Sequence, residues 1–381
     1  MAYSSLLSPI TIGNVRLPNR VIMAPLTRLR SDDLPENTVG GKKNIGGLPN
    51  ALMAEYYTQR ATAGMIITEA TDISPESKGY AGAPGIFNAA QIAGWKMITD
   101  SVHAKGGHMG MQLWHTGLVS HASLQPGHAK PMSASAVDLG KRVRTSLKDA
   151  DGNIYREQTT PARAMSTFEI KQTVDDFAQA ARNAMQAGMD FVEIHAAHGY
   201  LIHQFLYDSV NQRTDEYGGT LENRMRFLNE VLTAVTNAIG SARVGIRVSP
   251  LGMFNGVAAG SEQDALTIIK MIDGFNLAYL HISEPDWAGG KPLTQAFREQ
   301  IRAAYRGVII GAGAYTAEKG DKLIKEGLID AVAFGRNFIA NPDLVKRIEQ
   351  NAPLNKYQEH TVYAKGATGY TDYPTLEQVT S

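Results

Sequence analysis

Short apolar runs alternate with longer amphipathic segments along most of the chain. The short runs are rich in β-branched residues and predict buried strands, whereas the longer segments repeat apolar residues at helical spacing. The expected strands cover residues 21–24, 65–71, 108–114, 191–195, 244–248, 278–282, 308–311 and 331–334. The expected helices cover residues 51–63, 89–105, 170–187, 222–239, 261–275, 293–305, 317–326 and 342–351.

Eight strands, each followed by a helix, predict an α/β fold, the closed parallel (β/α)8 or TIM barrel. The alternative is an open doubly wound sheet, but the number of strands favours closure. Residues 10–17, with Gly13 and Asn14 at the centre, predict a β-hairpin that plugs the floor of the barrel. A chain of 381 residues is normal for such a barrel with added loops, so we expect residues 1–381 to form one domain.

Two loops at the expected mouth of the barrel are unusually long. Residues 116–167 separate the third strand from its helix, and they contain a turn signal at 149–153 between strand-like residues. We predict a hairpin excursion that covers the mouth. Residues 38–48 hold three Gly-Gly or Lys-Lys pairs and predict a mobile insertion in the first loop, where it would influence substrate size.

Composition narrows the classes of function. Lys plus Arg and Asp plus Glu both number 37, so the chain lacks the positive excess typical of nucleic-acid binding. The absence of cysteine excludes disulfides, thiolate nucleophiles and cysteine-bound iron–sulfur clusters. No apolar run approaches the ~20 residues that span a bilayer. We therefore expect a cytoplasmic protein with no nucleic-acid or membrane partner.

The fourth strand carries the most informative cluster of polar residues. His195, His198 and Tyr200 follow one another within six positions at its C-terminal end, where barrels place catalytic groups. Histidine can donate hydrogen bonds to a substrate oxygen near neutral pH. Tyrosine has an ordinary pKa of about 10, so it is protonated and can act as an acid. The cluster predicts a site that polarises a carbonyl and delivers a proton beside it.

The last two strands end in glycines that are typical of a phosphate site. Gly313 follows the seventh strand, and Gly335 with Arg336 follows the eighth. Backbone N–H groups at such ends bind an anion, and an arginine can bind two phosphate oxygens. A tight turn explains either group alone, but the two together favour phosphate binding.

Arg247 is a charged residue in the apolar fifth strand, and a buried charge requires a partner. The partner is either a carboxylate, from Glu193 or Glu69, or an anionic cofactor ring. Gln112 and Thr27 can bind an amide-rich heterocycle by hydrogen bonds. A phosphorylated heteroaromatic cofactor accounts for the whole set. Flavin is favoured over pyridoxal phosphate because no lysine lies at an expected strand end to form a Schiff base.

Five sequence segments together resemble the old yellow enzyme family of flavin-dependent alkene reductases. They are residues 23–28 (MAPLTR), 112–117 (QLWHTG), 195–201 (HAAHGYL), 211–219 (NQRTDEYGG) and the pair Gly335-Arg336. The resemblance extends from the N-terminal hairpin to residues 369–374, nearly the whole chain. It is greatest to the bacterial branch that includes N-ethylmaleimide reductase and pentaerythritol tetranitrate reductase.

The resemblance implies a non-covalent FMN and an exchange in two steps. NADPH or NADH would reduce the flavin, and an activated alkene, such as an α,β-unsaturated carbonyl or nitro compound, would then be reduced in the same place. His195 and His198 would bind the oxygen of this small-molecule substrate. Hydride would come from flavin N5 and the proton from Tyr200. Nitrate esters and quinones are further acceptors, and we expect a monomer or a weak homo-oligomer.

The resemblance also assigns binding roles to residues across the chain. The implied FMN-binding residues are Pro25, Thr27, Ala70, Gln112, Arg247, Gly313, Gly335 and Arg336. The implied substrate-binding residues are Tyr80, Trp114, His195, His198 and Tyr370. No bound metal is expected.

Two other functions stay open from the sequence. A metal-dependent barrel hydrolase or aldolase would bind zinc through His195, His198 and His115. A flavin-storage or redox-sensing protein would bind the cofactor with little turnover.

Overall fold

Eight parallel strands form a closed barrel in the computed structural model, which describes residues 3–34, 45–140 and 143–380. The strands run in the order β13-β14-β17-β18-β19-β3-β6-β8, and pairing of β8 with β13 closes the ring. They are β3 (Val21–Met23), β6 (Met65–Ile67), β8 (Met109–Trp114), β13 (Phe191–Ala196), β14 (Val244–Val248), β17 (Tyr279–Ser283), β18 (Val308–Ala312) and β19 (Ala331–Phe334). The barrel prediction is confirmed, and the open-sheet alternative is wrong.

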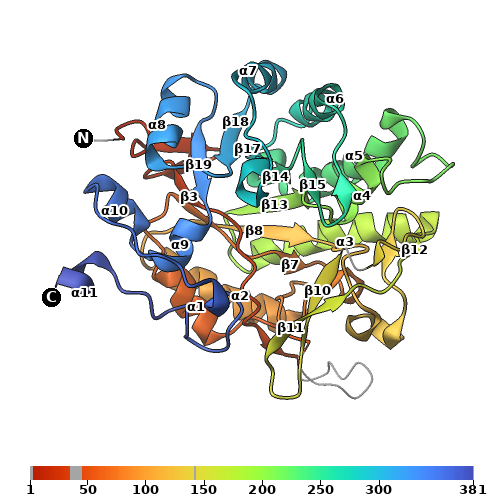
Figure 1. Cartoon of the computed structure of the whole chain (residues 1–381), viewed down its shortest axis with the longest axis horizontal. Helices are drawn as coiled ribbons and strands as arrows, with labels where there is room; N and C mark the ends of the chain where they lie inside the picture. The colour runs from red at the N-terminus through yellow and green to blue at the C-terminus, as the bar shows by residue number, and fades with distance from the viewer. Residues whose placement is uncertain (1–2, 35–44, 141–142, 381) are drawn as a thin grey trace.

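One outer helix follows each barrel strand along the chain. These helices are α1 (Ala51–Thr58), α2 (Ala89–His103), α3 (Thr167–Gln186), α5 (Leu221–Ile239), α6 (Glu262–Asp273), α7 (Gln295–Ala304), α8 (Ala317–Lys325) and α10 (Leu344–Glu349). Figure 1 shows them around the strands, with α6 and α7 on the side opposite α1 and α2. All eight expected helices are present.

The ends of the elements are set by local hydrogen bonds that periodicity does not reveal. Helix α3 begins at Thr167, earlier than the expected residue 170, because the Ser166 side chain caps it and Glu169 bonds back to Ser166. The expected strand 65–71 divides into β6 and the short β7 (Thr71–Asp72), which pairs in parallel with the C-terminal end of β8. The hydroxyls of Thr68 and Thr71 both donate to the Glu69 carbonyl, so the chain turns there instead of continuing the sheet.

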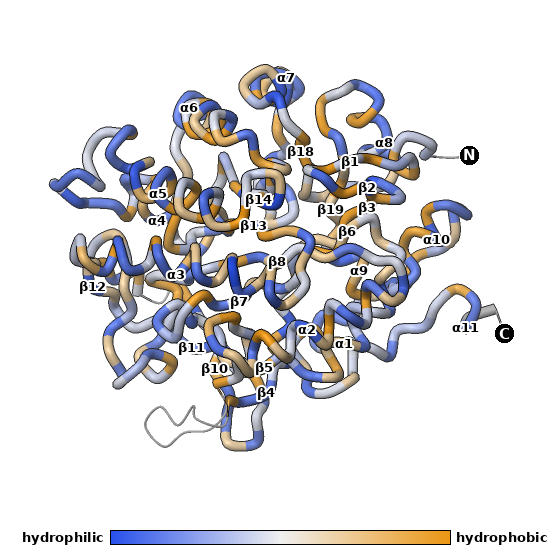
Figure 2. Tube along the Cα trace, turned by 180° about the vertical axis from the view of Figure 1, so that it is seen from behind, coloured by the Kyte–Doolittle hydropathy of each residue, from blue (hydrophilic) through white to orange (hydrophobic). Residues whose placement is uncertain are grey.

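The N-terminal hairpin closes the floor of the barrel. Strands β1 (Ile10–Ile12) and β2 (Val15–Leu17) pair antiparallel, and they lie beside β18 and β19 in Figure 2. Ile12 and Leu17 are fully buried in the cluster of apolar side chains inside the barrel. Gly13 is required at the turn because its φ is 51° and a Cβ would lie 2.0 Å from the Ala242 carbonyl oxygen.

The excursion after β8 contains the expected hairpin. Strands β10 (Arg144–Lys148) and β11 (Ile154–Gln158) pair antiparallel across the turn at 149–153. The shorter β9 (Met132–Ser133) and β12 (Arg163–Ala164) pair parallel. Of the predicted insertion at 38–48, residues 38–44 lie outside the described residues. Its end forms β5 (Gly47–Leu48), which pairs with β4 (Asp32–Asp33).

Several short elements were not expected from the sequence. Helix α4 (Leu201–Leu206) follows β13, helix α9 (Arg336–Ala340) follows β19, and α11 (Leu376–Thr380) lies near the C-terminus. Strands β15 (Met253–Phe254) and β16 (Val257–Ala258) form a hairpin after β14. The 3-10 helices are η1 (Pro75–Ser77), η2 (Ala122–Leu124), η3 (Pro126–His128), η5 (Ser241–Arg243), η6 (Pro285–Ala288) and η7 (Glu359–Thr361).

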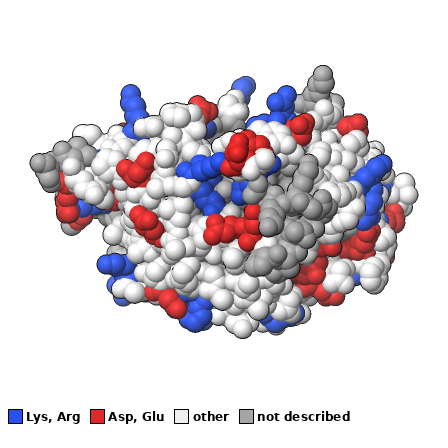
Figure 3. Space-filling view, turned by 90° about the horizontal axis from the view of Figure 1, so that it is seen from below, with Lys and Arg blue, Asp and Glu red and all other residues white. Residues whose placement is uncertain are grey.

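On the face drawn in Figure 3, basic and acidic side chains are interspersed. No helix in the described part of the chain is both long and apolar enough to cross a membrane.

Candidate active site

The three residues of the fourth-strand cluster lie together at the C-terminal end of the barrel. The ring of His195, at the end of β13, lies 5.3 Å from that of His198 and 4.9 Å from that of Tyr200. Trp114, at the end of the neighbouring β8, is parallel to His195 at 6.4 Å and lies 4.9 Å from Tyr200. The structure therefore brings two possible donors and one possible acid together beside an aromatic surface.

The turn that presents these side chains has an unusual backbone. His198 and Gly199 have φ values of 59° and 78°, in the left-handed region that costs most residues free energy. A Cβ on Gly199 would lie 2.3 Å from the Phe254 carbonyl oxygen, so only glycine fits. The His198 backbone is held by Ser249 Oγ, which accepts from its N–H, and by Asn255 Nδ2, which donates to its carbonyl. The loop after β14 thus fixes the direction of the His198 side chain.

Both histidines are suited to act as neutral hydrogen-bond donors. Burial, reinforced by the positive charge of Arg247, holds the pKa of His195 and His198 well below the ordinary value. His198 Nε2 lies 2.8 Å from Ser283 Oγ, which leaves Nδ1 of that ring for a ligand. His195 Nδ1 is buried and has no hydrogen-bond partner within the described chain. Neutral imidazoles can therefore offer N–H groups to a substrate oxygen without bringing two charges together.

Tyr200 is held with its hydroxyl protonated. Burial raises the pKa of Tyr200 well above its ordinary value, and the nearby Tyr80 adds to this effect. The Tyr200 hydroxyl donates to the Tyr80 hydroxyl at 3.2 Å. Tyr80 stacks on Trp114 with 5.4 Å between ring centroids. The predicted substrate residues Tyr80 and Trp114 thus join the histidines and Tyr200.

The structure does not bring Tyr370 into this group. Its fully buried ring stacks on Tyr56 at 3.9 Å, and the guanidinium groups of Arg28 and Arg30 lie over the same ring. Tyr370 therefore fastens the C-terminal segment to the loop after β3, and the substrate-binding role expected for it stays a prediction.

Arg247 is a buried cation that forms no ion pair with a carboxylate in the described part of the chain. In the register of β13, β14 and β17, it lies between His195 and His281. Its Nε has no hydrogen-bond partner, and within the described residues it forms no ion pair with Glu193 or Glu69. Burial lowers its pKa to about 10, which leaves it charged near neutral pH. This orphaned donor fits an electron-rich ring such as that of a flavin.

The carboxylate expected as a partner of Arg247 binds two other residues. Glu193 Oε1 accepts from Gln112 Nε2 at 2.7 Å, and Oε2 lies 2.8 Å from His281 Nδ1. Burial alone would raise the pKa of Glu193, but His281, Arg247 and Gln112 lower it below the ordinary value. The ionised Glu193 therefore fixes the Gln112 amide with its oxygen free to accept from a ligand. Sequence analysis did not identify His281.

The loop after β3 places Pro25 and Thr27 at the same end of the barrel. Glu69 Oε2 accepts from the backbone N–H groups of Arg28 and Leu29 at 3.1 and 3.2 Å. These bonds fasten the loop that carries Thr27 to the segment after β6 that carries the buried Ala70. Burial raises the pKa of Glu69 to about 7, although the two backbone bonds oppose this effect.

The predicted phosphate residues lie at the ends of two adjacent strands. Gly313 follows β18, whereas Gly335 follows β19 and precedes Arg336 at the start of α9. A Cβ on Gly313 would lie 2.4 Å from Asp286 Oδ1, and the next backbone N–H, that of Ala314, donates to the same oxygen at 2.8 Å. This loop therefore already offers a backbone donor to an anionic oxygen.

A family comparison decides which proteins this chain is related to. Residues 5–355 match the model of the NADH:flavin oxidoreductase / NADH oxidase family, and a solved old yellow enzyme homologue shares the fold. The chain belongs to the old yellow enzyme family. The family resemblance read from the sequence is confirmed, and the protein is a flavin-dependent oxidoreductase. The bacterial branch stays a prediction.

Three relatives of this old yellow enzyme illustrate the similarity. 12-Oxophytodienoate reductase 1 of Oryza sativa subsp. japonica is 43% identical over 385 residues, which cover 98% of this chain and 94% of the relative. Morphinone reductase in complex with tetrahydroNAD is 43% identical, with a TM-score of 0.90 and 99% of each chain covered. The old yellow enzyme homologue from Zymomonas mobilis is 39% identical, with a TM-score of 0.88, and the match covers 97% of this chain and 99% of that one.

Sequence analysis missed an aromatic pair in this old yellow enzyme. Phe254, in β15, and Trp287, in η6, lie 4.9 and 5.5 Å from the His198 ring and 5.8 Å from each other. Trp287 Nε1 donates to Ser283 Oγ, the atom that also bonds His198. Both aromatic residues follow the C-terminal ends of barrel strands, and this position in the sequence could have identified them as site residues. The two histidines therefore lie between two aromatic groups from strands on either side of β13.

The zinc alternative finds no support in the side-chain positions of this old yellow enzyme. His115 Nδ1 accepts from the Gly117 N–H, and burial lowers the pKa of His115 to about 3. Across the described ranges, no three His, Cys, Asp or Glu side chains lie together as a metal-binding group. The histidines near Tyr200 are thus better explained as hydrogen-bond donors.

Proposed function

We propose that this protein is an FMN-dependent ene reductase that uses NADPH or NADH to reduce the activated C=C bond of α,β-unsaturated carbonyl and nitro compounds. The observation that carries the proposal is the grouping of His195, His198 and Tyr200 beside an unpaired Arg247. Morphinone reductase, which has been solved with a nicotinamide analogue, supports a nicotinamide reductant.

His195 and His198 bind the carbonyl or nitro oxygen of the substrate. The two rings are nearly perpendicular, at 86°, so they can offer N–H groups from different directions to one oxygen. When the β-carbon accepts a hydride, negative charge develops on this oxygen. Two fixed donors in a largely buried site stabilise that charge more than they stabilise the neutral substrate.

When bound, FMN would supply the hydride chemistry, with a nicotinamide as the reductant. Arg247 and Gln112 are the residues that would hold the ring, together with Thr27, Pro25 and Ala70. Arg247 would favour the ring when it carries negative charge, because the guanidinium is buried and forms no ion pair among the residues that the structure describes. Gly313, Gly335 and Arg336 would hold the phosphate.

Tyr200 completes the reaction by giving its proton to the α-carbon. The raised pKa of Tyr200 keeps the proton on the hydroxyl until the carbon becomes basic. Tyr80 and Trp114 hold the phenol ring at the edge of the histidine pair. The aromatic side chains around this pair suit planar, conjugated substrates. Nitrate esters and quinones are further acceptors that the same two histidines could bind.

The test separates the two half-reactions of the FMN-loaded protein under anaerobic conditions. Tyr200→Phe should slow reoxidation of the reduced flavin by 2-cyclohexenone by about a hundredfold or more, since general acids contribute this much. Reduction by NADPH should change little, because it requires no proton from Tyr200. Equal slowing of both steps would refute the acid role. Normal reduction without any enone-dependent reoxidation in the unmodified protein would favour flavin storage or redox sensing.

A further inference from the structure

A buried ion pair lies next to the proposed active site but contains none of its assigned residues. Lys78 Nζ lies 2.8 Å from Asp72 Oδ2, and the two side chains are 3% and 0% exposed. Removing two charges from water costs free energy that their attraction only partly returns. Stability alone is therefore a weak explanation for such a pair, and its further contacts are informative.

Asp72 fixes the orientation of Trp114. It lies in β7, opposite Trp114 in the register of β8, and its Oδ1 accepts from Trp114 Nε1 at 2.7 Å. A hydrogen bond to a carboxylate is stronger than one between neutral groups. The indole ring is therefore held in one plane, the plane that faces His195 and Tyr200.

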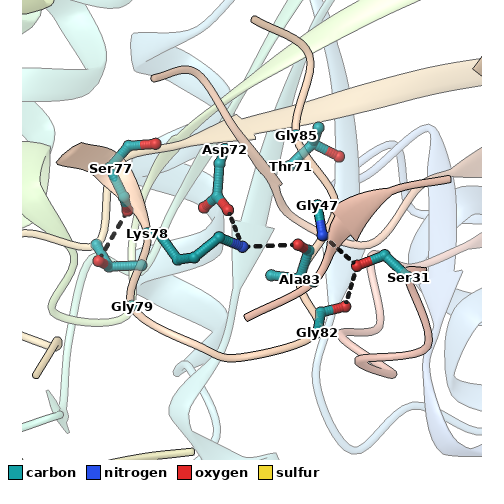
Figure 4. A network of polar contacts seen from close by, with 12 residues as sticks. Ser31, Gly47, Thr71, Asp72, Ser77, Lys78, Gly79, Gly82, Ala83 and Gly85 are labelled. Atoms are coloured by element: carbon teal, nitrogen blue, oxygen red, sulfur yellow. Dashed lines mark hydrogen bonds and ion pairs between the residues drawn. The ribbon is translucent and has the colours of Figure 1, made fainter. Parts of the chain in front are cut away.

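Lys78 fixes the position of Tyr80 from the other end of the pair. We call residues 77–83 the Tyr80 loop. Lys78 Nζ also donates to the Ala83 carbonyl at 2.8 Å, which closes this loop on itself. Figure 4 shows Lys78 between Asp72 and Ala83, with Ser31 beside them. The loop brings Tyr80 onto Trp114, where the two rings stack at an interplanar angle of 15°.

Other parts of the mouth bind the Tyr80 loop as well. Ser31 Oγ donates to the Gly82 carbonyl, and the Gly82 N–H donates to the Ile45 carbonyl. On the opposite side, the Ala81 N–H donates to the carbonyl of Ser146 in the excursion hairpin. The Tyr80 loop therefore contacts the segment of Ser31, the segment of Ile45 and the excursion hairpin. The buried ion pair of Lys78 and Asp72 lies beside these contacts.

We propose that Lys78 and Asp72 are positioning residues for Tyr200, which they orient through Tyr80 and Trp114. Both aromatic residues contact Tyr200: its hydroxyl donates to Tyr80, and its ring packs against Trp114 in a T-shaped arrangement. The inference rests on the proposed function, because it concerns the proton that Tyr200 delivers.

The geometry gives Tyr80 a specific part in that proton transfer. When Tyr200 gives its proton to carbon, the electrons of the O–H bond remain on the oxygen. Tyr80, 3.2 Å away, can then turn its own hydroxyl to donate to this phenolate oxygen. Water later returns a proton to Tyr200. Since misplacement of a reacting group by about 1 Å can cost a hundredfold in rate, the ion pair that places Tyr80 controls this step.

The experiment measures both half-reactions of FMN-loaded variants by anaerobic stopped flow. Lys78→Met keeps the length of the side chain but removes its charge and its two contacts. We expect reoxidation by 2-cyclohexenone to slow about tenfold to a hundredfold, and reduction by NADPH to change less than about threefold. The control, Lys96→Met, breaks an exposed ion pair with Asp100 and should change neither rate. Equal slowing of both steps, or no slowing, would overturn the inference.

Two further variants cover the case in which an unpaired Asp72 prevents folding. Asp72→Asn combined with Lys78→Met leaves no buried charge, and it should show the same selective slowing. Trp114→Phe keeps the ion pair but loses the indole N–H, and it should slow reoxidation in the same direction. A folded double variant with normal reoxidation would contradict the positioning role.

A double-mutant cycle separates this inference from the proposed function. If Lys78 acts through Tyr200, Lys78→Met should cause no further slowing of reoxidation in a Tyr200→Phe background. Additive slowing in that background would overturn the positioning role and leave the proposed function intact. Normal reoxidation in Tyr200→Phe alone would instead overturn the proposed function.

Discussion

At the scale of single residues, burial decides which charges the active site holds. His195 and His198 stay neutral because burial and Arg247 disfavour a second positive charge. Arg247 stays positive because its pKa falls only to about 10. The site thus combines one fixed cation with two neutral donors, an arrangement that suits a substrate oxygen on which negative charge develops.

Glu69 should make the stability of the folded protein depend measurably on pH. Its pKa is about 7 in the folded protein and 4.5 ordinarily, so the folded state binds the proton more tightly than the unfolded state. Stability should therefore decrease as the pH rises from about 4.5 to 7 and stay lower above that range. Glu69→Gln removes the titration, so its melting temperature should fall less between about pH 5 and pH 8.

The matched control for this prediction is Asp100→Asn, which removes an exposed carboxylate. It should leave the pH dependence of the melting temperature unchanged. A Glu69→Gln variant that loses as much stability over this range as the unmodified protein would show that Glu69 is not the responsible group.

Some residues of the site could be predicted from the sequence and others could not. His195, His198 and Tyr200 lie within six positions of the chain, so proximity along the sequence was enough to group them. Phe254 lies on a two-residue strand, too short for any period to reveal. The role of Tyr370 depended on resemblance alone, and its ring stacks on Tyr56 in the structure.

At the scale of elements, the barrel strands and outer helices follow from periodicity, whereas the turns that carry the chemistry do not. Helices α4 and α9 have six and five residues, less than two helical turns, so no amphipathic repeat identifies them. Yet Tyr200 is the residue that precedes α4, and Gly335 is the residue that precedes α9. Backbone geometry at these short turns therefore controls the site more than the regular elements do.

The Gly199→Ala variant tests whether the geometry of this turn determines the geometry of the site. The new methyl group would meet the Phe254 carbonyl at 2.3 Å in a backbone with a φ of 78°. We expect a loss of about 1–3 kcal/mol in the free energy of unfolding, together with slower reoxidation by enones, because His198 and Tyr200 move with the turn. Denaturant unfolding and stopped flow measure the two effects.

Gly219→Ala is the control for backbone strain alone. Gly219 has a φ of 80°, but a Cβ there would meet no atom within 4 Å. This variant should lose about 1 kcal/mol of stability and keep its full activity. If Gly199→Ala behaves in the same way, the steric contact with Phe254 does not position the turn.

At the scale of the whole molecule, stability and chemistry lie at opposite ends of the barrel. The hairpin of β1 and β2 buries Ile12 and Leu17 against side chains from the first residues of β6, β13 and β19. His195, Trp114 and Ser283 instead lie near the C-terminal ends of their strands. In barrel enzymes the first end serves stability and the second serves catalysis.

Ile12→Ala should therefore destabilise the protein without changing its reaction. Ile12 is fully buried, so truncation leaves a cavity and should cost about 2–4 kcal/mol of the free energy of unfolding. FMN affinity and both half-reaction rates should be unchanged at temperatures where the variant is folded. Thr11→Ala, at the exposed neighbouring position of the same strand, should change neither stability nor rates. A loss of FMN affinity in folded Ile12→Ala would show that the floor of the barrel also shapes the cofactor site, against the separation of the two ends.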